Sequence, residues 1–378
     1  MSELSEKRAF LVLNALPHIG PVSVNRLIAR FGGAPQVFDA GKHDLEQVRG
    51  IGPAASAAIL GWRELFDIAR EEERMEKAGV VFVTRSDPEY PRLLREIDSA
   101  PVGFYRKGAN VLDAPCVAIV GSRRTTLYGL ATAKKLAAGL ARLGFCVVSG
   151  LARGIDAAAH EGALSAGGKT AAVLGTGIDI VYPPENVDLF RQVAAAGALL
   201  SEFPLGRRAD IQSFAMRNRI VSGLCEAVVV VESGVSGGSM ITARFAGEQG
   251  RLLFAVPGRI DQETSAGCHQ LIRDGATLLT GVDDILSELN YLGGLRPRPI
   301  PDASGGDGGG APAPRPPDNL PPEEAAVLAC LANGAALTAD AVSVATGLGV
   351  EKVSGLLLML ELRRLVVKRA DGSFEARV

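Results

Sequence analysis

Residues 116–154 decide the fold of this chain and read CVAIVGSRRTTLYGLATAKKLAAGLARLGFCVVSGLARG. An apolar run of strand length at Cys116–Val120 leads into Gly121, a polar SRRTT loop and then a segment with the apolar spacing of a helix. A second apolar run at Cys146–Val148 ends in another loop that contains glycine. The stretch therefore predicts a βαβ unit whose parallel strands are covered on both faces.

The first loop of this unit has the chemistry of a phosphate-binding turn. Gly121 allows the backbone to approach a ligand closely, and the helix that follows Ser122–Thr126 directs unpaired N–H groups towards it. Arg123 and Arg124 add positive charge at the same place. We therefore expect this loop to bind an anion.

The composition indicates a reduced, cytoplasmic protein of more than one domain. A chain of 378 residues is too long for one average domain, and its five Cys have no regular spacing that predicts a disulfide framework or a zinc site. No apolar run approaches the length of a membrane span, so neither membrane insertion nor export is expected. The formal net charge is −2, and nucleic-acid binding would therefore need a local basic patch.

Residues 1–75 are predicted to form a bundle of short helices. Two Ile-Gly-Pro turns, at residues 19–21 and 51–53, resemble those of helix-hairpin-helix elements, also called SAM-like, in which exposed N–H groups bind DNA phosphates. The alternative is a compact helical cap with tight turns. The cap is favoured over a DNA contact because few basic residues lie nearby.

From residue 80 to about 290 the pattern predicts an α/β domain with a doubly wound, mostly parallel sheet, an extended Rossmann-like fold. Residues 80–108 form an insert with a strand, a short helix and a second strand, and we expect it to extend the sheet. The main strands are expected near residues 116–120, 146–149, 171–175, 198–202, 227–232, 252–256 and 277–279.

Loops that follow parallel strands emerge at one edge of the sheet, which would bring distant basic residues together. The arginines on these loops are Arg123, Arg124, Arg153, Arg207 and Arg208. The acids on the same loops, Asp156, Asp179, Glu185 and Glu202, predict a patch of mixed charge. The SGVSGGS loop at residues 233–239 either binds a second phosphate or makes a close strand-to-helix turn, and the sequence favours neither.

The sequence does not meet the requirements of three nucleotide-binding or catalytic motifs. The first loop lacks GxGxxG, and no acid ends the second strand, so NAD is not expected. The GGKT tetrapeptide at 167–170 leads into a strand rather than a helix, which predicts a turn instead of a P-loop. Asp156 and His160, four residues apart on a predicted helix, are interpreted as structural because no nucleophile motif lies beside them. We expect no catalytic residue, metal or cofactor.

The composition changes abruptly after residue 290. Residues 293–322 contain 7 Gly and 9 Pro, which predicts a flexible linker. Residues 323–378 predict three helices and a pair of strands, which resemble a winged helix. Its third helix begins with too few basic residues for a major-groove reader, so a protein-contact or auxiliary role is favoured.

An ordered set of motifs resembles the DNA processing protein A (DprA, or Smf) family over residues 80–290. The motifs are GSRRTTLYG, SGLARGIDAAAHEGAL, GTGIDIVYPPEN, LLSEFPLG, FAMRNRIVSGL, ESGVSGGSMITARFAGEQGR, and AVPGRI followed by SAGCHQLIRDGATLL. The resemblance implies a homodimer that binds single-stranded DNA during natural transformation, protects it and loads the RecA recombinase onto it.

The resemblance also implies DNA-contacting positions. They are Ser122 and Arg123 in the first loop, Gly150, Leu151 and Ala152 in the second, and Phe214, Arg217 and Arg219 in the FxxRNR element. The sequence is nearly as consistent with a position for Phe214 in the core as with a contact to DNA. Members can carry a lysine shortly before this phenylalanine, and Arg207 or Arg208 is expected to replace its charge here.

The alternative to a DNA-binding protein is an enzyme, of the Rossmann-like nucleoside-monophosphate phosphoribohydrolase type. Its PGGxGTxxE loop carries a catalytic Glu, whereas the comparable SGGSMITAR segment has Thr242 where that signature would lead to its Glu. The sequence therefore favours a binding protein over a hydrolase.

Overall fold

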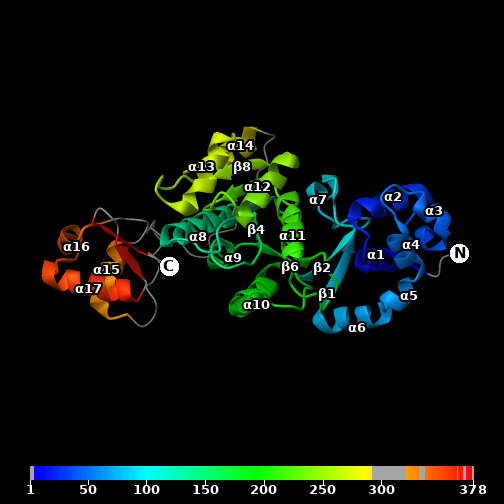
Figure 1. Cartoon of the computed structure of the whole chain (residues 1–378), viewed down its shortest axis with the longest axis horizontal. Coiled ribbons are helices and arrows are strands. Elements are labelled where there is room, and N and C mark those ends of the chain that lie inside the picture. The colour runs from blue at the N-terminus through cyan, green and yellow to red at the C-terminus, as the bar shows by residue number, and fades with distance from the viewer. Residues whose placement is uncertain (1–3, 292–319, 332–336, 364, 369–371, 377–378) are drawn as a thin grey trace.

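The computed structural model describes residues 4–291, 320–331, 337–363, 365–368 and 372–376. The N-terminal helices lie at one end, an α/β domain lies in the middle and the C-terminal helices lie at the other end (Figure 1). Most of the predicted linker at 293–322 falls outside the described residues.

A nine-stranded sheet forms the centre of the α/β domain, in the order β1-β2-β6-β5-β4-β3-β7-β8-β9. Strands β3 to β9 pair in parallel, whereas β1 and β2 pair antiparallel with each other and β2 pairs antiparallel with β6. The predicted doubly wound sheet and its extension by residues 80–108 are confirmed. The strands are β1 (Val80–Thr84), β2 (Gly103–Gly108), β3 (Cys116–Val120), β4 (Cys146–Ser149), β5 (Thr170–Leu174), β6 (Ala198–Ser201), β7 (Ala227–Val230), β8 (Leu252–Ala255) and β9 (Thr277–Leu278).

The strand order reverses at β3. The chain passes from β3 through β4 and β5 to β6 on one side, and then crosses to β7 and β8 on the other side. In open α/β sheets the loops diverge at such a switch point and leave a crevice at the carboxyl ends of the strands. The crevice here lies between the loops after β3 and β7.

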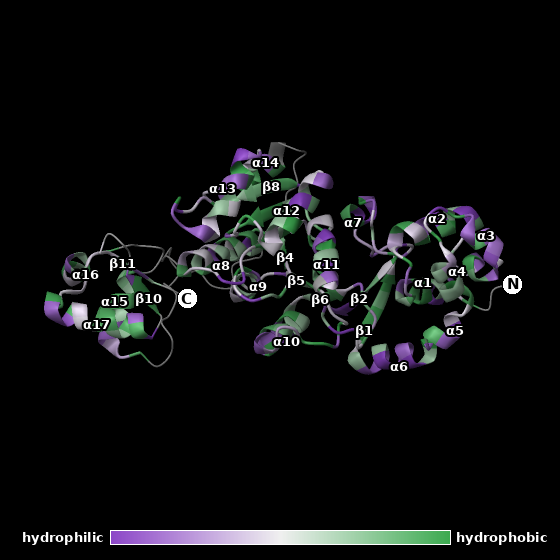
Figure 2. Ribbon diagram, viewed as in Figure 1, coloured by the Kyte–Doolittle hydropathy of each residue, from purple (hydrophilic) through white to green (hydrophobic). Residues whose placement is uncertain are grey.

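Helices cover both faces of the sheet because alternate side chains of each buried strand point to opposite sides. Val117 and Ile119 belong to one apolar cluster, with residues of α8, α9 and α14. Ala118 and Val120 belong to another, with residues of α11, α12 and α13. Figure 2 shows the strands as the hydrophobic layer between these helices. The helices are α7 (Arg92–Glu96), α8 (Leu127–Arg142), α9 (Ile155–Ser165), α10 (Val187–Ala196), α11 (Ile211–Gly223), α12 (Gly238–Glu248), α13 (Ala266–Arg273) and α14 (Val282–Tyr291).

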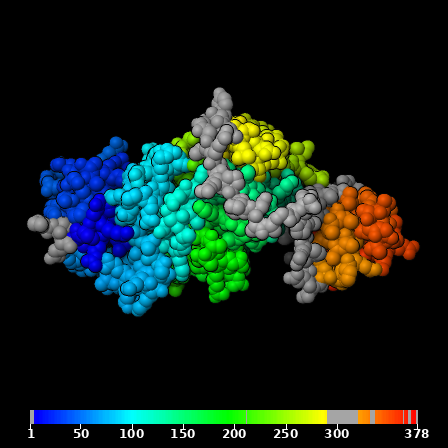
Figure 3. All heavy atoms as spheres, turned by 180° about the vertical axis from the view of Figure 1, so that it is seen from behind, coloured from blue at the N-terminus to red at the C-terminus, as the bar shows by residue number. Residues whose placement is uncertain are grey.

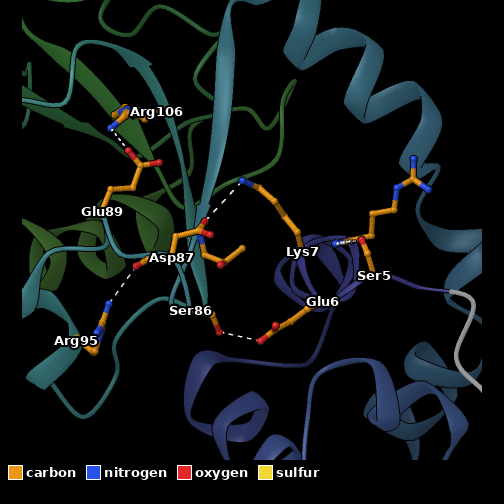
Figure 4. A network of polar contacts seen from close by, with 10 residues as sticks. Ser5, Glu6, Lys7, Ser86, Asp87, Glu89, Arg95 and Arg106 are labelled. Carbon is orange, nitrogen blue, oxygen red and sulfur yellow. Dashed lines mark hydrogen bonds and ion pairs between the residues drawn. The ribbon is translucent and has the colours of Figure 1, made fainter.

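The N-terminal helices pack against the edge of the sheet that contains β1. Their apolar side chains share one cluster with Phe82 of β1 and Tyr105 of β2, and the view from behind shows the two parts in direct contact (Figure 3). Polar contacts add to this packing, since Ser86 donates to Glu6 at 2.9 Å and Lys7 lies 3.6 Å from Asp87 (Figure 4). The helices are α1 (Glu6–Ala15), α2 (Pro21–Phe31), α3 (Lys42–Glu46), α4 (Pro53–Leu60), α5 (Trp62–Leu65) and α6 (Ile68–Ala78), which runs past the predicted boundary at residue 75.

The C-terminal domain contains α15 (Pro322–Cys330), α16 (Ala339–Thr346), α17 (Val350–Leu362) and the antiparallel pair β10 (Val366–Lys368) and β11 (Phe374–Ala376). Leu127 at the start of α8 packs against its apolar cluster. Within the described ranges, no single helix is long and apolar enough to cross a membrane. The bent pair α16 and α17, at 110°, meets that test together by length and composition only.

Four of the five cysteines are buried, and all five are free thiols. Cys116 and Cys146 face each other in register on β3 and β4, at the amino-terminal edge of the sheet. The neighbouring Cys146 thiol and burial raise the pKa of Cys116, and burial raises the pKa of Cys225 beside them. The thiols therefore serve as core side chains, as the sequence predicts.

Candidate nucleic-acid interface

The loop between β3 and α8 is organised before any ligand binds. The hydroxyl of Ser122 accepts from the Arg124 N–H at 3.1 Å and donates to the Arg124 carbonyl at 2.5 Å. Thr126 caps α8 by accepting from the Gly129 N–H at 3.1 Å. These local bonds are typical of Ser and Thr in turns and helix caps. They leave Arg123 and Arg124 exposed on a fixed backbone.

Glu232, just after β7, holds this loop in place through hydrogen bonds. Its side chain is 2% exposed, and its carboxylate accepts from the Thr125 hydroxyl at 2.5 Å, the Thr126 N–H at 3.0 Å and the Thr126 hydroxyl at 2.6 Å. Sequence reasoning missed this residue. A signal was present, because an acid directly ends the apolar run AVVVV at the carboxyl edge of the sheet.

The second loop, after β4, is held by Asp156. Its carboxylate accepts from the N–H groups of Gly150 at 3.2 Å and Ala152 at 3.4 Å. These amides, expected at the DNA, thus already have an acceptor. Leu151 lies between them with φ 55°, is fully buried, and its carbonyl accepts from the Asn186 side chain at 3.0 Å. Burial raises the pKa of Asp156, although the Arg217 guanidinium opposes that shift.

Helix α11 directs its two arginines to different places. Arg217 is 4% exposed, lies beneath Gly150 and donates to the Val173 carbonyl, and burial lowers its pKa to about 10. Arg219 is buried, and its Nη2 donates to both carboxylate oxygens of Glu202, at 2.7 and 2.8 Å. Residues two apart on a helix face different sides. The expectation that both arginines face the DNA therefore needs correction, because Arg219 is turned away from the cleft.

Phe214 lies at the site rather than in the core. Its half-buried ring is 5.1 Å from the ring of Tyr182, and the guanidinium of Arg123 lies 5.3 Å from its centroid. Such cation–π and tilted aromatic contacts hold a ring in place while leaving it accessible. Tyr182, 37% exposed, was not singled out from the sequence. Its position in the long GTGIDIVYPPEN loop gave no periodic signal.

A cleft of about 480 Å³ lies at the switch point between β3 and β7. Of the predicted positions, it brings together Ser122, Arg123, Arg124, Gly150, Ala152, Phe214 and Arg217. Asp156, Thr242 and residues of the glycine loop at 233–239 also line it. A second cavity of about 670 Å³ lies beside Arg123 and Arg124 and is also lined by Val367 and Glu375 of the C-terminal domain.

The other loop arginines do not line this cleft. Arg153 pairs with Glu185, and Arg207 pairs with Asp210 at 2.6 Å. Arg208 is exposed next to Arg207. The predicted convergence at the cleft therefore holds for Arg123 and Arg124, whereas ion pairs with neighbouring acids occupy Arg153 and Arg207. This agrees with the predicted mixture of charges along the edge.

The remaining polar motifs have structural roles. His160 is fully buried and its Nδ1 lies 2.7 Å from the Thr170 hydroxyl. Gly167 has φ 67° and turns the chain into β5, as predicted for GGKT. No group of three or more His, Cys, Asp or Glu side chains in the described part of the chain could hold a metal ion.

Comparison with known proteins places the chain in one family. Residues 81–290 match the family described as DNA recombination-mediator protein A, and residues 311–372 match the DprA winged helix domain. Protein Smf of Synechocystis sp. is 34% identical over 99% of both chains. The structure of DNA processing protein A from Streptococcus pneumoniae is 34% identical, with a TM-score of 0.67 over 75% of this chain and 98% of that one.

A further solved structure is similar to this chain. It is described as showing the single-stranded DNA binding mode of DNA processing protein A from Helicobacter pylori. That protein is 30% identical to this chain, with a TM-score of 0.51 over 56% of this chain and 96% of that one. From the matched domains, the full-length relative and the shared fold, we conclude that this chain belongs to the DNA processing protein A family.

Proposed function

We propose that this chain binds single-stranded DNA in the cleft between the loops after β3 and β7. The observation that carries this proposal is Phe214, which contacts both Arg123 and Tyr182 and lines a cleft together with Arg123 and Arg217. Arginines hold phosphates, and exposed aromatic faces stack on bases without reading their identity. This combination suits a strand whose bases are unpaired.

The proposal extends to a role in natural transformation. In the cytoplasm, the chain protects incoming single strands, works as a homodimer and loads the RecA recombinase onto them. Family membership supports these parts, and the Helicobacter pylori relative supports the single-stranded ligand. The C-terminal domain fits an auxiliary role, because Glu351 lies in the first turn of α17 and Lys352 is paired with Glu323 at 2.5 Å.

Binding measurements with single-stranded and duplex oligonucleotides of one length test the DNA-binding part. Within the described residues, four candidate arginines have no carboxylate within 4.0 Å, namely Arg123, Arg124, Arg208 and Arg217. If three or four of them contact phosphates, log Kd should change with log salt with a slope of magnitude roughly 2 to 3, at about 0.7 per contact. We expect the single strand to bind more tightly. Equal affinity for duplex, or a slope near zero, would contradict the proposal.

Arg123→Ala tests the loop directly. Loss of a charge-assisted phosphate contact should weaken single-strand binding by about tenfold or more and reduce the salt slope by about 0.7. Arg142→Ala is the matched control, because Arg142 is an exposed arginine at the opposite end of α8. Unchanged affinity of Arg123→Ala would remove the loop from the site.

RecA loading and dimer formation need separate measurements. On single strands coated with a single-strand binding protein, this chain should shorten the lag before RecA begins to hydrolyse ATP. Arg123→Ala should lengthen that lag again. Light scattering at micromolar concentration tests the dimer, and a monomeric mass there would contradict this part while leaving DNA binding intact.

A further inference from the structure

The turn from β7 into α12 ends in a helix N-terminus that faces the cleft. Helix α12 starts at Gly238 after Gly237, and no side chain caps it. Gly237 is required by the turn, because a Cβ there would lie 2.5 Å from the Ser233 hydroxyl and 3.0 Å from the Gly234 carbonyl. Gly238 has no such requirement, since a Cβ there would meet nothing within 4 Å. The first N–H groups of α12 therefore border open space in the cleft.

Arg217 gives an independent sign of a ligand at this place. Its guanidinium is more than nine-tenths buried and lines the same cleft, yet within the described residues its Nε has no hydrogen-bond partner. Its Nη1 donates to a neutral carbonyl, that of Val173. A buried cation with an open donor is costly unless an anion compensates it. Next to it on α11, Asn218 donates to the Gly238 carbonyl at 3.3 Å, which ties α11 to the start of α12.

In the described structure, the carboxylates around the cleft form no ion pair with Arg217. Asp156 is close enough to oppose the lowering of the Arg217 pKa, but it accepts from Gly150 and Ala152, and no ion pair within 4.0 Å joins it to Arg217 among the described residues. Glu232 is bonded to Thr125 and Thr126 beneath the first loop. The space between α12 and Arg217 thus remains open to an anion from outside.

We propose that the start of α12, together with Arg217, forms a second phosphate subsite, which binds an internal phosphodiester of the same strand that the Arg123 loop holds. This inference rests on the proposed function and deepens it. Helix N-termini bind phosphate through converging N–H groups and the helix dipole. With phosphates bound after both β3 and β7, the strand would cross the switch point and place a base beside Phe214.

Two substitutions at Gly238 distinguish the loss of a backbone N–H donor from the addition of side-chain atoms. Gly238→Pro removes one N–H donor, and proline suits the first helical position because Gly237 before it is already extended, with φ −66° and ψ 151°. Gly238→Ala adds a Cβ into open space and keeps the donor. We expect Gly238→Pro to bind single strands about fivefold to tenfold more weakly than Gly238→Ala, with the salt slope unchanged because no charge is lost.

Circular single-stranded DNA distinguishes an internal phosphate from a terminal one. The difference between the Pro and Ala variants should persist on a circle, which has no ends. A difference seen only with 5′-phosphorylated linear strands would overturn the assignment to an internal phosphodiester. Equal affinities of the two variants would overturn the subsite but leave the proposed function standing, whereas failure of the unmodified chain to bind single strands would remove both.

A second pair of variants covers the case in which Gly238→Pro does not fold. Gly238→Asp places a carboxylate at the subsite, where an acid favours the helix but repels phosphate. Gly238→Asn is its neutral match in shape. We expect the Asp variant to melt at least as high as the Asn variant and to bind single strands at least about tenfold more weakly. Equal binding by this pair would also overturn the subsite.

Discussion

At the scale of single residues, Phe214 allows the proposed base stacking in the cleft to be tested by one substitution. Its ring contacts Arg123 and Tyr182 and lines the cleft, so its removal should affect the binding of bases more than the stability of the folded state. We expect Phe214→Ala to cost about 1–3 kcal/mol of binding free energy with the salt slope unchanged. Phe245→Ala is the matched control, because Phe245 also has an arginine over its half-buried ring, at 5.4 Å, but does not line the cleft. A lower melting temperature with full DNA affinity would return Phe214 to a structural role.

His160 shows how burial fixes a proton. The Thr170 hydroxyl donates its only proton to the Val147 carbonyl at 2.7 Å, so His160 Nδ1 must carry the hydrogen that joins it to Thr170. Nε2 is then unprotonated, and it has no hydrogen-bond partner within the described structure. Burial, with a smaller effect of Arg217, lowers the pKa of His160 to about 3.

This pKa predicts a loss of stability in mild acid. Between pH 3 and about 6.5 the unfolded chain binds a proton at His160 that the folded chain does not, so the free energy of unfolding falls as pH falls. From pH 6.5 to 5 the loss should be about 2 kcal/mol, at about 1.4 per pH unit. His160→Asn keeps an N–H donor for Thr170 and cannot titrate. Urea unfolding followed by circular dichroism should show a shallower pH dependence for this variant, and identical pH profiles would refute the assignment.

At the scale of elements, the first loop depends on a carboxylate from a neighbouring strand. Glu232→Gln replaces one acceptor oxygen with a donor opposite Thr125 and Thr126, which should loosen the loop. We expect single-strand affinity to fall severalfold, by less than in Arg123→Ala. Glu226→Gln is the control, since that carboxylate accepts from the Cys116 N–H at 2.7 Å at the opposite edge. The same affinity loss in both variants would indicate general destabilisation instead.

The sequence predicts elements better than it predicts contacts between them. Apolar runs bounded by glycine locate the strands, and loops after parallel strands locate the edge, because both signals are local. The rotation of α11 about its axis is not local, and so Arg219 was expected at the DNA although Glu202 holds it in the core. The support from Glu232 crosses more than a hundred residues. Only the assembled sheet brings such partners together.

At the scale of the whole molecule, the N-terminal helices brace the loops after β5 and β6. Glu71 of α6 accepts from the Leu205 N–H at 2.9 Å, and Arg74 reaches both the Leu205 carbonyl and Asp179, each at 2.9 Å. Asn14 of α1 donates to the Glu202 carbonyl at 2.7 Å. This bracing favours the helical cap among the two interpretations of residues 1–75. Contact of this region with DNA stays an untested alternative.

The reactivity of the buried thiols should report transient opening of the folded core. Cys116, Cys146 and Cys225 are buried near the amino-terminal edge of the sheet, Cys268 has a pKa raised to about 12 by burial, and Cys330 is the half-buried exception. A thiol-specific reagent attacks the thiolate, so the four core cysteines should be labelled only when the sheet opens. With such a reagent, one thiol should react quickly and four slowly. Saturating single-stranded DNA should slow the second phase, since a ligand of the folded state suppresses opening. Rapid labelling of all five would mean that the sheet exchanges with solvent far more often than its packing implies.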